Sequence, residues 1–144
     1  MNEDQTRQRI LAFADVDTTT DSGNTFFFYN PASLGPPDYM FPFATIVNSD
    51  VYEKYSNLNR PSVFRLSIGV AKQAFLKLFG PDDPPADFDY TVLDELMPHP
   101  EYGQMRWLCI LSPSDETFEA KVAPLLNEAY EIAVSKRARS ANRG

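Results

Sequence analysis

The chain has 144 residues and a mass of 16.3 kDa, which fits a single domain over residues 1–144. A hydrophobic content of 43% and an aromatic content of 13% exclude global disorder. The formal net charge of −7 disfavours broad, non-specific nucleic-acid binding, because a phosphate backbone attracts clustered cations.

The first part of the chain predicts a helix, a turn and a strand. Asn2 or Asp4 can cap a helix that ends near residue 14, because a short polar side chain accepts from the amides of the first turn. Residues 15–24 carry turn chemistry, with Asp-Ser-Gly-Asn at their end. The aromatic residues 26–29 then predict a short strand that stops at Asn-Pro.

Two further strands are separated by polar or proline-rich connectors. Residues 31–42 hold four prolines and a glycine, so they predict a connector. Residues 43–47 predict a strand, and the polar stretch 48–61 contains one predicted helical turn over 50–54. In 63–70 (VFRLSIGV) apolar residues alternate with polar ones, which is the period of a half-buried strand.

The second half predicts two short helices, a strand and a long helix. Residues 71–79 predict a helix that Gly-Pro stops, and the breaker-rich loop 81–87 separates it from a shorter helix within 89–96. The apolar run 105–111 predicts a strand. A helical apolar stripe extends over 117–136 and comprises Phe118, Val122, Leu125, Leu126, Ala129, Ile132 and Ala133.

The C-terminal helix carries its own start and stop signals. Ser114 is the predicted cap, and the acidic first turn suits the helix dipole. Pro124 lies inside the stripe and should kink or split the helix. Residues 137–144 form a basic tail that is expected to fray. Its cations can serve as a nucleic-acid arm or, as is commoner, as a solvated helix end: Lys136, Arg137, Arg139 and Arg143.

Together these elements predict an α+β fold. An antiparallel sheet of about four or five strands would be packed by an N-terminal, a short middle and a C-terminal helix.

The single Cys109 excludes an internal disulfide and lies in an apolar run, where a buried, inert thiol is expected. No apolar stretch reaches the ~18 residues of a membrane span, and the polar start is unlike a signal peptide, so we expect a cytoplasmic protein that engages no membrane.

The acidic segment before the aromatic strand has two interpretations. Asp15, Asp17 and Asp21 are typical oxygen ligands, but an EF-hand loop starting at Asp15 needs glycine and glutamate where threonine and phenylalanine stand. A looser magnesium or calcium site stays open. We favour the interpretation that these side chains cap the helix end and the turn, so no metal site is predicted.

Three other polar residues are candidates for ligand contact. His99 lies between two prolines and can act as a general base, although a loop histidine that caps a backbone group is favoured. Arg65 and Arg106 are each predicted on the non-core face of an apolar strand, with Trp107 on the opposite face. Neighbouring strands would make them a cationic patch for a carboxylate or phosphate; the alternative is that each pairs with surface carboxylates.

Several strings in the chain are specific enough to suggest relatives. ADVDTTTDSGNTFFFY, FPFATIV, NLNRPSVFRLSIGV and LMPHPEYGQMRWLCIL resemble, over nearly the whole chain, a bacterial family of uncharacterised small proteins, a domain of unknown function. The last two-thirds, with a late Trp strand and a helix containing YEIAV, are similar to MmcQ/YjbR-like proteins. That resemblance implies a double-wing α+β fold and DNA binding. The acidic charge and the longer loops of this chain depart from the pattern and argue against DNA.

Three functional interpretations follow from these residues. The first is a non-enzymatic binding or interaction module whose ligand-facing residues are Arg65, Arg106, His99, Asp15, Asp17 and Asn48. The second is a small-molecule or metal-assisted enzyme site built from Asp15, Asp17, Asp21, Asn48 and His99. The third is a homo-oligomer whose partner surface consists of Tyr39, Phe41, Tyr52 and Tyr55. The sequence identifies no cofactor, no catalytic residue and no specific partner.

Overall fold

The computed structural model describes residues 1–31, 41–51, 55–81 and 88–143, with side chains up to residue 137. Its strands are β1 (Val16–Asp21), β2 (Asn24–Tyr29), β3 (Ala44–Val47), β4 (Arg65–Gly69), β5 (Met97–Pro98) and β6 (Trp107–Leu111). Its helices are α1 (Glu3–Leu11), α2 (Lys72–Phe79), η3 (Gly103–Met105), α3 (Asp115–Thr117), the π-helix η4 (Phe118–Val122) and α4 (Ala123–Arg143).

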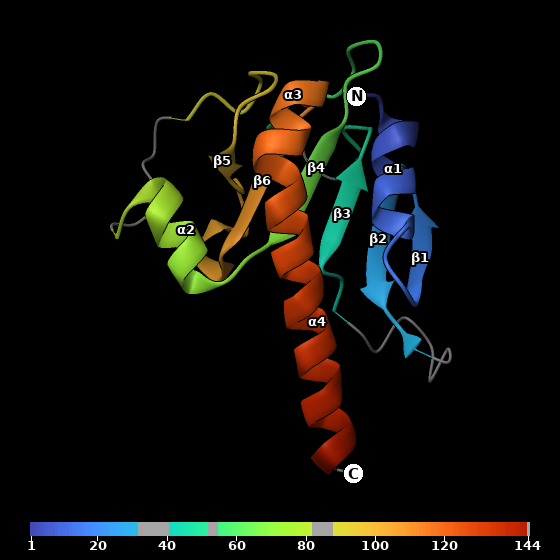
Figure 1. Ribbon diagram of the computed structural model, residues 1–144. Coiled ribbons are helices and arrows are strands. Elements are labelled where there is room, and N and C mark those ends of the chain that lie inside the picture. The colour runs from blue at the N-terminus through green and yellow to red at the C-terminus, as the bar shows by residue number, and fades with distance from the viewer. Residues whose placement is uncertain (32–40, 52–54, 82–87, 144) are drawn as a thin grey trace.

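The strands form one antiparallel sheet in the order β1-β2-β3-β4-β6-β5. The expected α+β class is confirmed, and within the described part of the chain the sheet has six strands rather than four or five. Figure 1 shows α4 lying across the sheet, with α1 beside it and α2 next to β6. None of the helices in the described part of the chain combines the length and apolarity needed to cross a membrane.

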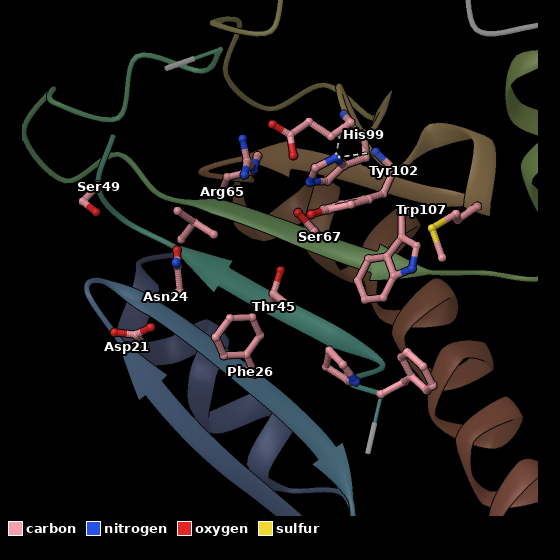
Figure 2. Close-up of a pocket in the computed structure, with 15 residues that line it drawn as sticks. Asp21, Asn24, Phe26, Thr45, Ser49, Arg65, Ser67, His99, Tyr102 and Trp107 are labelled. Atoms are coloured by element: carbon pink, nitrogen blue, oxygen red, sulfur yellow. Dashed lines mark hydrogen bonds between the residues drawn. The ribbon is translucent and has the colours of Figure 1, made fainter. Parts of the chain in front are cut away.

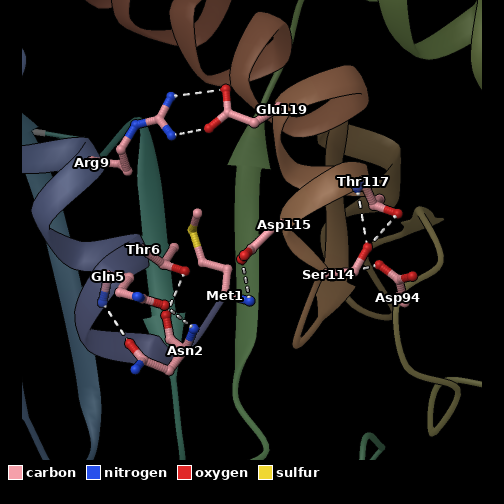
Figure 3. Close-up of polar contacts among 10 residues, drawn as sticks. All are labelled: Met1, Asn2, Gln5, Thr6, Arg9, Asp94, Ser114, Asp115, Thr117 and Glu119. Atoms are coloured by element: carbon pink, nitrogen blue, oxygen red, sulfur yellow. Dashed lines mark hydrogen bonds and ion pairs between the residues drawn. The ribbon is translucent and has the colours of Figure 1, made fainter.

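Side chains identified in the sequence fix the helix starts. Asn2 Oδ1 accepts from the Gln5 amide at 2.7 Å, and Gln5 Oε1 accepts from the Asn2 amide at 2.9 Å, which completes a capping box (Figure 3). Ser114 Oγ accepts from the amide three residues further on at 3.1 Å (Figure 3). Both predicted caps are therefore confirmed. An exposed ion pair between Arg9 and Glu119 also joins α1 to η4 (Figure 3).

The core lies between one face of the sheet and the helices. Alternation along β4 directs Leu66 and Ile68 toward this core, as predicted, together with their partners on β6. The C-terminal stripe supplies the opposite layer, with Phe118 and Val122 fully buried. Pro124 interrupts the helix as expected: it has no amide to close a regular turn, and the turn just before it is the wider η4.

The segment 15–24 is a strand, and the expected turn is confined to its end. β1 occupies most of it and pairs with β2, while Ser22 and Gly23 make the turn with positive φ values of 52° and 86°. The sequence of β1 is VDTTTD, so neither face is apolar enough to produce a period-2 pattern. The threonine run was the available signal, because β-branched residues favour strands.

Two expectations in the second half of the chain were also wrong. The described residues of 88–96 contain no helix, and Leu93 instead forms a parallel bridge with Leu111 of β6. β6 begins at Trp107 because η3 occupies the preceding residues, and Arg106 ends that turn with a φ of 67°. The predicted connectors 31–42 and 81–87, and the helical turn over 50–54, fall largely outside the described residues.

Candidate functional site

The face of the sheet opposite α1 and α4 carries a pocket of about 690 Å³ (Figure 2). Directly paired residues of antiparallel strands share a face, so the register sets the pocket floor. One row across β2, β3 and β4 is Asn24, Val47 and Arg65, and the next row is Phe26, Thr45 and Ser67. The loop from His99 to Met105 forms one wall, and Phe41 and Pro42 form another.

The cation of this pocket is buried. Arg65 is only 3% exposed and Ser67 1%, so β4 is covered on both faces and the expectation of a half-buried strand was wrong. Arg65 Nη1 donates to Ser56 Oγ at 3.1 Å. Ser67 Oγ has no hydrogen-bond partner within the described part of the chain. Burying a guanidinium costs free energy unless polar groups bind it. Polar groups beside Arg65 therefore allow the fold to hold this charge in the pocket wall.

His99 is held by its own loop and is 6% exposed. Its Nδ1 accepts from the amides of Glu101 and Tyr102, both at 3.0 Å, which confirms the expected backbone-capping histidine (Figure 2). Since Nδ1 is an acceptor, the proton of the neutral ring lies on Nε2, which becomes a donor. Burial, together with the positive charge of Arg65, lowers the pKa of His99 to about 3. The ring is therefore neutral at physiological pH.

Trp107 lines the pocket, and so lies on the same face of the sheet as Arg65. Its cross-strand partner is Gly69, and a Cβ at Gly69 would stand 3.0 Å from Trp107 Cε2. The expectation that Arg106, rather than Trp107, shares the face of Arg65 was wrong, because β6 is apolar on both faces and its phase cannot be read from hydrophobicity. Arg106 precedes the strand and is absent from the pocket lining; its guanidinium lies 5.7 Å from the Phe75 ring centre.

The acidic candidates are dispersed. Asp21 stands at the pocket rim, whereas Asp17 Oδ2 accepts from Asn30 Nδ2 at 2.8 Å on the edge strand. Asp15 adopts a φ of 62°, and its carbonyl accepts from the Asn30 amide at 2.8 Å. Asn48 Nδ2 donates to the carboxylate of Glu3 at 3.2 Å. Among the described residues, no three His, Cys, Asp or Glu side chains form a group able to hold a metal ion.

Of the predicted residues, the structure therefore brings Arg65, His99 and Asp21 to one pocket. Sequence reasoning missed several lining residues, namely Phe26, Thr45, Ser67, Tyr102, Met105 and Trp107. For Phe26, Thr45 and Ser67 the signal was available, because they occupy alternate positions on strands that the sequence does predict. What was lacking was the register that aligns these positions across neighbouring strands.

The match of this chain to a protein family spans the whole pocket. A family model described as a family of unknown function (DUF6194) matches residues 1–142. The chain belongs to this family. The DUF6194 match includes every element that lines the pocket, and it confirms the expected likeness to a domain of unknown function. No curated protein and no solved structure matches the chain.

Proposed function

We propose that the protein is a binding module that holds a small organic anion in the pocket on its sheet. The observation that carries this proposal is the position of Arg65, a buried cation on the pocket wall. A guanidinium presents its N–H groups in a planar fork that matches a carboxylate or a phosphate. Because Arg65 is buried, its charge-assisted hydrogen bonds to a ligand are stronger than those of a guanidinium in bulk solvent.

The groups around Arg65 extend the same chemistry. His99 offers Nε2–H as a neutral donor, and Ser67 offers a hydroxyl. Two carboxylates, Asp21 and Glu101, also line the pocket, but both residues are exposed at its rim, where water and salt screen their repulsion of an anion.

The same geometry favours binding over the enzyme alternative. A general base needs a free lone pair, but His99 Nδ1 accepts two amides and Nε2 carries the proton. The enzyme alternative required Asp15 and Asp17 beside His99, and neither lines the pocket. Of its residues only Asp21 and His99 line the pocket, and His99 cannot serve there as the general base.

Ligand-dependent melting of matched variants tests the proposal. A panel of aliphatic and aromatic carboxylates and phosphates should contain members that raise the melting temperature by mass action, by several degrees at about 100 times Kd. Arg65→Gln should weaken their binding about 10-fold or more, since a hydrogen bond to a charged group is lost. Arg106→Gln, a matched loss of charge outside the pocket, should leave it unchanged.

Two results would overturn the proposal. One is a flat response of the wild-type protein across the whole panel. The other is an equal loss of binding in Arg65→Gln and Arg106→Gln, which would mean that net charge alone matters. If Arg65→Gln fails to fold, Ser67→Ala replaces it, because that variant removes a pocket hydroxyl that has no hydrogen-bond partner in the described part of the chain.

The other sequence-based expectations also stay proposals. These are the bacterial origin, the cytoplasmic location, the single domain with a frayed basic tail, and the likeness to MmcQ/YjbR-like proteins. A homo-oligomer is supported by Phe41 and Tyr55, which are 92% and 50% exposed, while Tyr39 and Tyr52 lie outside the described residues. Light scattering across a range of protein concentrations tests it, and a constant monomer mass would exclude it.

A further inference from the structure

We infer that the anion bound in this pocket carries an aromatic ring, which stacks against Trp107 while the charged group contacts Arg65. This inference rests on the proposed function. It adds the chemical class of the ligand, an aryl carboxylate, to the anion site. The supporting observations are the layout of the pocket, the fixed position of Trp107 and the kind of side chains around it.

The pocket is polar at one end and apolar at the other. Arg65, Ser67 and Gly69 follow one another on the same face of β4, and Trp107 pairs with Gly69 at the far end. At about 3.3 Å per residue, the backbone positions of Arg65 and Gly69 are about 13 Å apart. Figure 2 shows Arg65 and Trp107 on opposite sides of Ser67. A ligand that reaches both ends must therefore be elongated, with its charge at one end.

Trp107 is held in position by close contact of its indole with Gly69 and by backbone hydrogen bonds. Its indole lies over Gly69, where a Cβ would meet Cε2 at 3.0 Å and Cζ2 at 3.2 Å. The Trp107 carbonyl accepts from the His99 amide at 2.9 Å, and the Trp107 amide donates to the Tyr102 carbonyl at 3.2 Å. The loop that carries His99 thus also fixes the backbone of Trp107. A glycine at position 69 is what allows the ring to approach the sheet so closely.

The neighbours of Trp107 in the pocket suit an aromatic guest. Phe26 and Phe41 supply two further rings, and Met105 supplies a thioether, which makes favourable contacts with ring edges. Phe41 and Met105 are 92% and 66% exposed, so both keep apolar surface that a ligand can cover. The volume of about 690 Å³ exceeds the needs of a bare carboxylate and is within the range of small-molecule sites.

A matched pair of probes separates stacking from simple burial. The probes 4-phenylbutyrate and 4-cyclohexylbutyrate share the charge, the linker and the number of carbons, and the cyclohexyl compound is the more hydrophobic. Burial alone therefore predicts that the cyclohexyl compound binds at least as tightly. We expect calorimetry to show instead a preference of about 2- to 10-fold for the phenyl compound, the range for aromatic pairing beyond area burial.

Trp107→Leu is the variant that addresses the indole. It removes the ring and keeps an apolar side chain, so the preference for phenyl should fall to about one, while 4-cyclohexylbutyrate, the internal control, still binds. If Trp107→Leu does not fold, Gly69→Ala serves instead, because its added Cβ pushes the ring away by a few tenths of an ångström and should reduce the preference.

The outcomes separate this inference from the proposed function. If both probes bind the wild type and the phenyl preference is absent, or if it persists unchanged in Trp107→Leu, the aromatic inference is overturned and the anion site stands. If the phenyl preference is present but Arg65→Gln binds as well as the wild type, the ring site stands and the anion site is overturned. If neither probe binds at about 10 mM, the aromatic inference is overturned, and the anion site stands or falls with the response to the panel of carboxylates and phosphates.

Discussion

His99 should make the stability of the protein fall as the pH drops below neutrality. The folded protein keeps the ring neutral, with a pKa of about 3 in place of 6.5, because the ring is buried and lies near the charge of Arg65. The unfolded chain keeps the ordinary pKa and therefore binds a proton first when the solution is acidified. The stability contributed by neutral His99 is fully present above about pH 6.5 and is lost as the pH falls toward 3.

The size of this effect follows from proton linkage. One proton taken up only by the unfolded state is worth about 1.4 kcal/mol per pH unit within the window. Between pH 7 and pH 5, His99 should therefore lower the free energy of unfolding by about 2 kcal/mol. With an unfolding entropy of about 2.1 cal/mol/K per residue over the chain, this corresponds to a drop of about 6 °C in Tm.

The matched control is His99→Asn. Asparagine can place Oδ1 where His99 Nδ1 accepts the amides of Glu101 and Tyr102, but it does not titrate. Urea unfolding at pH 7 and pH 5, followed by the fluorescence of Trp107, measures both proteins, and the carboxylates contribute equally to each. The wild type should lose about 2 kcal/mol more than the variant. Equal losses would mean that the folded protein protonates His99, and the reasoning would fail.

Two further predictions concern the helix cap and the buried thiol. Ser114→Ala removes the acceptor of the Thr117 amide and should cost about 1 kcal/mol, or about 3 °C in a thermal melt. Ser135→Ala on the exposed side of α4 is the control, and an equal loss there would argue against the cap. Cys109 is fully buried, so a disulfide reagent should label it only as urea unfolds the protein. Fast labelling without urea would place the thiol at the surface.

Local signals in the sequence predict much of the fold. The cap at Asn2 and the alternation along β4 both act over a few residues, so both are readable from the chain and agree with the structure. β1 was missed because it is an edge strand of the sheet, where polar side chains are tolerated on both faces. The short helix expected within 89–96 was wrong, since contact with β6 holds that segment extended at Leu93.

The candidate site depends on information that no local pattern contains. Arg65 and His99 were identified as single residues, but their convergence depends on β6, which lies between β4 and β5 in the sheet. The pairing of Gly69 with Trp107 joins positions far apart in the chain. The register could not be assigned because β6 is apolar on both faces, and the phase of Trp107 was therefore mistaken.

The loop that carries His99 also bears on how a ligand would bind in thermodynamic terms. Its turn is closed by the Gly103 amide, which donates to the His99 carbonyl at 3.1 Å, and by the two amides on Nδ1. These bonds form within the protein alone, so this wall of the pocket has its shape before any ligand arrives. Binding then costs little conformational entropy on this side, and association need not wait for the loop to rearrange. A wall of this kind selects ligands by shape, because it gains nothing by adapting to a poor fit.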